Sequence, residues 1–112
     1  MDLELEDGQV FVRPNRATID GWLRSLAVNG PNSFAALVQG SGDYIQTACR
    51  GTRFVIEQRT QQPHHHYRAI RTADASDLFE IEEVVEAFEE YAFSINTPPS
   101  FTWELMDAEV GI

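Results

Sequence analysis

The sequence has little of what marks a metal centre, a disulfide-bonded domain or a membrane protein. Its one cysteine, Cys49, excludes an internal disulfide and a metal cage built from thiolates alone. No apolar run approaches the roughly 18 residues that a membrane-spanning helix needs. The acidic N-terminus lacks the apolar centre of a signal peptide. We therefore expect a cytoplasmic protein with no membrane association.

The sequence also lacks lysine, and its eight basic residues are all arginines, the last of which is Arg71. Residues 1–71 carry these eight arginines against seven acidic residues, a formal net charge of +1. Residues 72–112 carry eleven acidic residues and no arginine, a net charge of −11. This acidity argues against nucleic acid and anionic membranes as ligands. A partner attracted over long range would be basic, although the acidity could equally serve solubility alone.

The length of 112 residues and the apolar share of 43% suit one domain with a packed core, so we expect a single α+β domain over residues 1–112. Periodicity and turn residues divide the chain into a hairpin (1–12, turning at Asp7 and Gly8), a helix (18–28, capped by Thr18), a meander of four strands (33–70), an acidic helix (78–94, stopped by Pro98 and Pro99) and a final strand (101–106). The order ββ-α-ββββ-α-β predicts a mainly antiparallel sheet of about six or seven strands, packed against two helices.

The acidic helix carries the candidate binding residues. Its predicted apolar stripe, which includes Val84, Val85 and Phe88, should pack on the sheet. Like charges one turn apart destabilise a helix, and no base follows Arg71, so these acids either form a solvated face or meet a basic partner. Catalysis is disfavoured because solvated carboxylates keep ordinary pKa values. The candidate partner-binding residues are the five glutamates of this helix: Glu82, Glu83, Glu86, Glu89 and Glu90.

The chain also has one histidine run, His64, His65 and His66. On a strand, His64 and His66 would share a face and could chelate one ion, but the sequence offers no third ligand nearby. We therefore predict no metal and no cofactor, and we interpret the histidines as polar residues at the edge of a strand. Cys49 has no partner at a catalytic spacing and is expected to be a small core residue. No motif for a nucleophile or a phosphate-binding loop is present, so we predict no catalytic residues and no enzyme activity.

Six short segments, taken in order, are similar to a group of known proteins. They are NSF at 32–34, YIQTA at 44–48, FVIEQR at 54–59, HYRA at 66–69, EEVVEAF at 82–88 and FTWE at 101–104. Together they resemble small bacterial immunity proteins of polymorphic or contact-dependent toxin systems, over roughly residues 20–106. The resemblance implies a non-enzymatic protein that neutralises a toxin by masking its active site. The histidine run and the arginine-only basic set are not part of that pattern, and no binding residues are carried over.

Three hypotheses follow. The first is an inhibitor of a cognate toxin, a basic nuclease- or deaminase-type domain, because a toxin that acts on nucleic acid has a positive cleft that an acidic surface can occlude. The alternative is an acidic protein-interaction or dimerisation module without a toxin partner. The third is a metal-assisted enzyme centred on the histidines. A homodimer stays open under each hypothesis.

Overall fold

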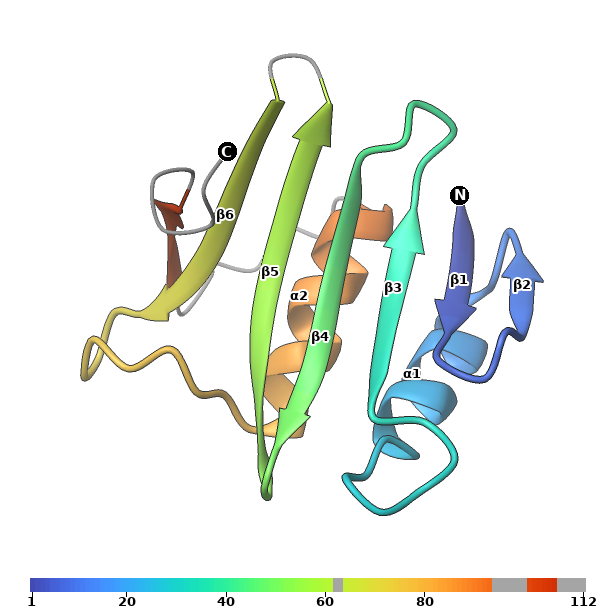
Figure 1. The fold of residues 1–112 in the computed structure, drawn as a ribbon, viewed down its shortest axis with the longest axis horizontal. Helices are drawn as coiled ribbons and strands as arrows, with labels where there is room; N and C mark the ends of the chain where they lie inside the picture. The colour runs from blue at the N-terminus through green and yellow to red at the C-terminus, as the bar shows by residue number, and fades with distance from the viewer. Residues whose placement is uncertain (62–63, 94–100, 107–112) are drawn as a thin grey trace.

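The computed structural model describes residues 1–61, 64–93 and 101–106, which form one sheet and two helices (Figure 1). The strands and helices follow one another in the predicted order. They are β1 (Asp2–Leu5), β2 (Val10–Val12), α1 (Arg16–Arg24), β3 (Phe34–Val38), β4 (Tyr44–Arg50), β5 (Arg53–Gln61), β6 (His64–Arg71), α2 (Ile81–Phe93) and β7 (Phe101–Leu105). Among the described residues, no helix combines the length and the apolar character needed to cross a membrane.

The seven strands lie in the order β2-β1-β3-β4-β5-β6-β7, and every neighbouring pair is antiparallel. This confirms the predicted α+β class. The β1–β2 hairpin turns at Gly8, whose φ of 93° suits glycine. Both helices lie on one face of the sheet, behind the strands in Figure 1, and no helix of the described residues lies on the other face. The sheet therefore has a helix-covered face and an open face.

The register assigns side chains to these two faces. Leu3, Leu37 and Ile45 stand in one cross-strand row on the helix-covered face and are buried. The adjacent row, on the open face, runs through Gln46, Glu57 and Arg68 and is polar. Because successive side chains of a strand point to opposite faces, this alternation sets which residues enter the core.

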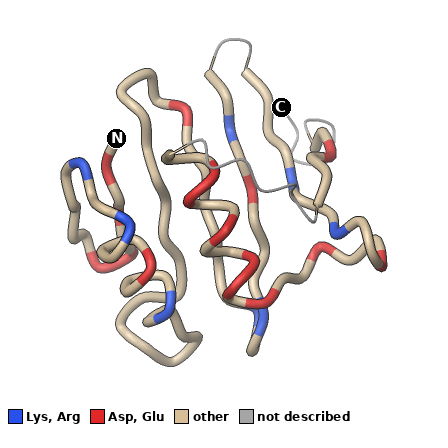
Figure 2. The backbone as a smooth tube through the Cα atoms, turned by 180° about the vertical axis from the view of Figure 1, so that it is seen from behind, with Lys and Arg blue, Asp and Glu red and all other residues tan. Residues whose placement is uncertain are grey.

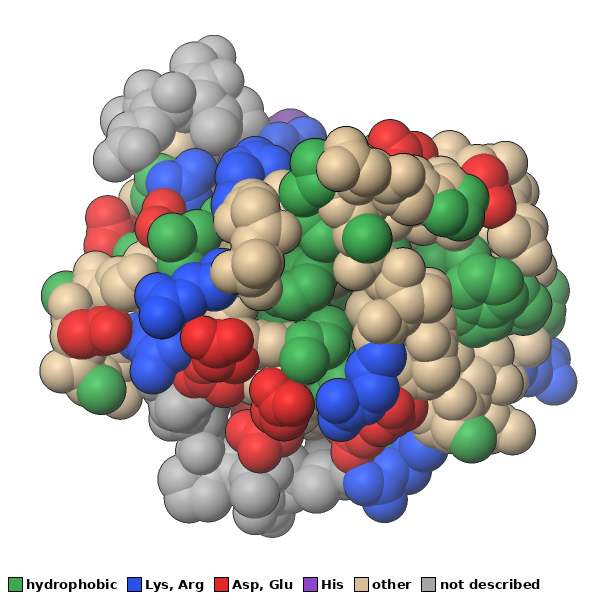
Figure 3. All heavy atoms as spheres, turned by 90° about the horizontal axis from the view of Figure 1, so that it is seen from below, with side chains coloured by type: hydrophobic (Ala, Val, Ile, Leu, Met, Phe, Trp, Pro, Cys, Tyr) green, Lys and Arg blue, Asp and Glu red, His purple; other side chains and the backbone are tan. Residues whose placement is uncertain are grey.

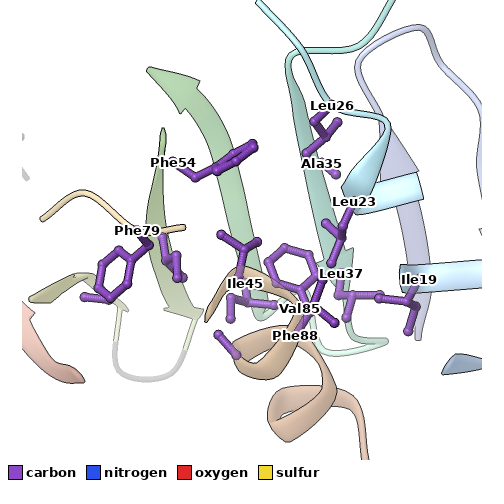
Figure 4. Close-up of a cluster of buried hydrophobic side chains, with 14 of the residues drawn as sticks. Ile19, Leu23, Leu26, Ala35, Leu37, Ile45, Phe54, Phe79, Val85 and Phe88 are labelled. Carbon is purple, nitrogen blue, oxygen red and sulfur yellow. The ribbon is translucent and has the colours of Figure 1, made fainter. Parts of the chain in front are cut away.

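Phe88 lies at the centre of the core, between α2 and the helix-covered face of the sheet (Figure 4). It is fully buried, as is Val84, and Val85 is nearly so. In the close-up, Phe88 and Val85 of α2 lie among the sheet residues Leu37 and Ile45. The prediction that this stripe of α2 packs on the sheet is confirmed, and α2 rests mainly on β4 and β5.

The predicted boundaries of the first helix, 18–28, are wrong at both ends. Its N-cap is Asn15 rather than Thr18, and the Asn15 side chain accepts a hydrogen bond of 2.8 Å from the Thr18 backbone N–H. Asparagine satisfies the free N–H groups of a first turn as well as threonine does. The helix ends at Arg24, and the loop that follows is held by Asn32, a buried side chain that accepts a hydrogen bond from the Asp7 backbone N–H.

The second helix begins at Ile81, after a short bridge in which Phe79 pairs with Phe54 of β5. The Glu80 backbone N–H donates to the Glu83 carboxylate at 3.0 Å, which closes the first turn in the manner of a capping box. The structure describes α2 to Phe93. The predicted end at Ser94, the proline stop at 98–99 and the last residues of the chain lie outside the described residues.

Candidate protein-binding surface

The five glutamates of α2 fall into two groups. Glu82 and Glu86 are exposed and Glu90 is half-buried. The side chains of Glu83 and Glu89, in contrast, are only 18% and 16% exposed. Figure 2 shows acidic residues recurring along α2 on the side of the molecule that bears the helices. The sequence pattern placed all five in one class, and burial separates them.

Arginines from earlier in the chain neutralise part of this helix. Arg16 of α1 bonds Glu89 at 2.6 Å, and Arg71 at the end of β6 bonds Glu83 at 2.7 Å. Figure 3 shows acidic and basic side chains lying against one another on the lower side of the molecule as it is drawn in Figure 1. The expectation that the acids of this helix meet no internal base is therefore wrong. The fold places α1 and the end of β6 beside α2, although the arginines are remote in sequence.

Glu83 and Glu89 are thereby structural residues. Glu83 accepts hydrogen bonds from both the Glu80 backbone and the Arg71 guanidinium, so it fixes the start of α2 against β6. Glu89 links α2 to α1 through Arg16. A charge-assisted hydrogen bond to a partly buried carboxylate is stronger than a surface ion pair. Neither carboxylate is available to a partner without giving up these contacts.

Three glutamates and one aromatic ring remain on the outward side of the helix. Glu82 is 68% exposed and lies 3.7 Å from Arg24, a loose surface pair. Glu86 and Glu90 have no arginine within 4 Å among the described residues. Phe93, at the end of the helix, is 40% exposed. We call Glu82, Glu86, Glu90 and Phe93 the outer face of α2.

A groove adjoins this outer face, between α2 and β7. Its volume is about 150 Å³, and its floor is formed by Ile45 and Gln58, which face each other across β4 and β5. The groove exists because α2 contacts the sheet at β4 and β5, whereas neither described helix lies over β7. Its walls come from α2 on one side and β7 on the other: Ala87, Glu90 and Tyr91, then Phe101 and Trp103.

The aromatic walls are held by further contacts. The rings of Phe101 and Trp103 meet edge to face at 5.1 Å between centroids, and Phe101 meets Phe79 in the same way at 5.8 Å. Tyr91 lies opposite on α2, where burial raises the pKa of its hydroxyl and a hydrogen bond with the Gln39 side chain acts against that shift. Edge-to-face pairs of this kind stabilise one relative orientation of the rings. The groove is therefore a preformed feature.

The open face of the sheet carries a second polar cluster, centred on Glu57. This carboxylate lies 3.0 Å from the His66 ring, 3.2 Å from the Gln46 amide and 3.8 Å from Arg68. Arg68 also reaches Asp77 at 3.4 Å. Each of these groups has a partner within the cluster, although the buried Nε of Arg68 has none among the described residues, so the arrangement mainly links neighbouring strands.

The histidine run forms the start of β6, where His64, His65 and His66 pair with β5, and the register with β7 covers only Tyr67–Arg71. His66 is buried beside Glu57, whereas His64 is exposed. Among the described residues, no three histidine, cysteine or acidic side chains are placed to share a metal ion. Cys49 is buried, as predicted, and burial raises the pKa of its thiol.

Sequence reasoning missed the residues that line the groove. Trp103 lies on the helix-covered face of β7, opposite the buried Ala69, and is 37% exposed. Phe93 stands off the apolar stripe of α2, which was a usable signal, since an aromatic residue on a polar helix face is a common interface feature. The groove itself depends on where α2 crosses the sheet, which helical periodicity does not specify. Comparison of the chain with models of known protein families, with curated proteins and with solved structures finds no match.

Proposed function

We propose that this chain is a non-enzymatic immunity protein that binds and neutralises a cognate toxin with a basic nuclease- or deaminase-type domain. The observation that carries the proposal is the outer face of α2, where Glu86 and Glu90 lack internal partners beside the exposed ring of Phe93. Protein interfaces combine such an aromatic residue with complementary charge. The similarity of six ordered segments to immunity proteins favours the toxin as partner over other basic proteins.

The inhibitory mechanism follows from charge and shape. A toxin that acts on nucleic acid needs a positive cleft to bind its substrate. The outer face of α2 presents three carboxylates that are four residues apart in sequence. A helix rises about 1.5 Å per residue, so they are spaced about 6 Å apart along its axis. Docked over such a cleft, these carboxylates take the place of substrate phosphates. No chemical step on this chain is needed, and inhibition should be stoichiometric.

The test is to search the genes adjacent to that of this chain for a toxin, to express its toxin domain, and to measure binding and toxin activity as the chain is added. We expect inhibition that is complete at one equivalent. Glu86→Lys should weaken binding severalfold, because it places a positive charge in the interface. Glu4→Lys is the matched control: Glu4 is likewise an exposed glutamate without an ion pair to a described residue, but it lies on β1.

Three outcomes are informative. Loss of binding in Glu86→Lys with retention in Glu4→Lys supports the proposal. Equal effects of the two variants would move the interface away from α2. Absence of any interaction with the toxin would refute the proposed function, and sedimentation of the chain alone would then decide whether it is a dimerisation module.

A further inference from the structure

The groove beside α2 combines chemistry that the outer face lacks. It brings two aromatic side chains, Tyr91 and Trp103, to opposite walls. It also contains two polar side chains, Glu90 and Gln58, that have no hydrogen bond or ion pair with any other residue of the described chain. Polar groups of this kind in a partly enclosed apolar site are able to pair with a ligand that carries matching groups.

From this combination we infer that the groove is an anchor site for an arginine side chain of the protein partner. This inference rests on the proposed function. The guanidinium is planar and stacks on aromatic faces, with Trp103 as the best surface available. Its N–H groups match the carboxylate of Glu90 at the rim and the amide oxygen of Gln58 at the floor. Its methylene stem fits against the apolar Ala87 and Ile45.

Size and charge both favour this occupant. At about 150 Å³ the groove takes the tip of one side chain. It is too small for a free metabolite or drug-sized ligand, whose sites start at about 300 Å³. The charge of Glu90 disfavours an acidic side chain and leaves an apolar side chain with an uncompensated carboxylate. Lysine matches the charge but not the plane, so it should bind less well than arginine.

The groove also complements the outer face of α2 geometrically. Glu86 and Glu90 both belong to the outer face and lie one helical turn apart, and Glu90 also forms the rim of the groove. A basic partner that meets the outer face can therefore place one arginine over the rim without changing its approach. Arginine and tryptophan are the residue types that most often dominate binding energy at interfaces, and they do so in partly enclosed sites.

The test uses NMR on the whole chain and needs no toxin. The protein has two tryptophans, so its spectrum should show two indole N–H signals, which Trp22→Phe assigns. We titrate the capped peptide Gly-Arg-Gly and, separately, its citrulline analogue, which has the same shape without the charge. The Trp103 signal should shift saturably with the arginine peptide, at least tenfold more tightly than with the citrulline peptide. The Trp22 signal, from the α1 side of the molecule beside Phe11, should not follow it.

Variants locate the binding. Glu90→Gln should weaken the arginine peptide severalfold, whereas Glu86→Gln, which removes the same charge from the adjacent turn, should leave it unchanged. Equal binding of the arginine and citrulline peptides, equal effects of the two variants, or no saturable shift would overturn the inference. Peptide binding without toxin binding would keep the arginine site and reject the proposed function. Toxin binding without peptide binding would keep the proposed function and reject the arginine site.

Discussion

His64 and His66 stand two residues apart on the same side of β6, yet their surroundings differ. His66 is 7% exposed and its ring lies 3.0 Å from Glu57, on the adjacent strand. His64 is exposed near the end of the strand. A histidine paired with a carboxylate inside a cluster contributes hydrogen bonding that solvent cannot replace. We therefore expect His66, unlike His64, to contribute to the stability of the sheet.

His66→Ala should lower the free energy of unfolding by about 1–3 kcal/mol, because it removes the 3.0 Å contact with the half-buried Glu57 carboxylate and leaves it only Gln46 and the more distant Arg68. His64→Ala should change it by less than about 0.5 kcal/mol, as is usual for an exposed site. Urea unfolding of both variants measures the difference. Equal values would mean that the Glu57 cluster does not stabilise the sheet.

Phe88 and Phe93 offer a comparison of the same residue type in one helix. Phe88 is fully buried in the core and Phe93 is 40% exposed. Phe88→Ala should cost about 3–5 kcal/mol, since it removes a large buried side chain and leaves a cavity. Phe93→Ala should cost less than about 1 kcal/mol, because its ring is already partly exposed to water. Thermal unfolding is the measurement, and a Phe88→Ala protein as stable as Phe93→Ala would show that α2 packs through another face.

At the scale of elements, α2 is held at both ends by arginines of other elements. Arg71 of β6 bonds Glu83 in its first turn, and Arg16 of α1 bonds Glu89 in its third. The first of these contacts also completes the cap at Glu80. A helix with five glutamates and no lysine or arginine of its own depends on such contacts to offset its internal repulsion.

Glu83→Ala should therefore lower the free energy of unfolding by about 2 kcal/mol, through loss of the cap and of the contact with Arg71. Glu86→Ala is the matched change one turn away at an exposed position. It should be neutral or slightly stabilising, because it relieves repulsion and alanine favours helix. Urea unfolding compares the two. If both variants behave alike, the Arg71 contact contributes nothing and α2 is held by its apolar side alone.

Local signals in the sequence predicted the elements well. The meander of four strands, the Asp7–Gly8 turn and the stripe through Val84, Val85 and Phe88 each depend on neighbours in sequence, and the structure confirms all three. The start of α1 was missed because Asn15 and Thr18 are both competent caps, and which of them caps depends on the chain before it.

Long-range contacts explain why the site was predicted less well. The sequence separates Arg16 from Glu89 by 73 positions, and no periodicity links them. The charge distribution along the sequence, in which residues 72–112 have no base, therefore does not reveal the ion pairs that form in the folded structure. The groove has the same origin, since Ile45, Tyr91 and Trp103 meet only after α2 has crossed the sheet. Glu82, Glu86 and Glu90 were named correctly as outward residues, and Glu83 and Glu89 were not.

At the scale of the whole molecule, folding makes the charge distribution more even than the sequence suggests. The described residues fill a body of about 31 × 31 × 30 Å, so that arginines of the N-terminal part lie within reach of α2. The total remains −10, and the field at long range is negative whatever the local pairing. Steering of a basic partner therefore depends on the total charge, while complex lifetime depends on the residues that touch it.

These two contributions separate by salt concentration. Screening acts over about 10 Å at 0.1 M salt and about 3 Å at 1 M, so steering should be strong at the first and nearly absent at the second.

Glu4→Lys and Glu86→Lys change the total charge equally. We expect both to slow association with a basic partner at 0.1 M salt, and neither to slow it appreciably at 1 M. Dissociation should be faster only for Glu86→Lys, at both salt concentrations, because a contact within the interface is screened less than a distant charge. Association and dissociation rates measured by surface plasmon resonance against the toxin domain test this directly. If Glu4→Lys accelerates dissociation as much as Glu86→Lys does, the interface includes the β1 side of the sheet, and α2 acts through charge alone.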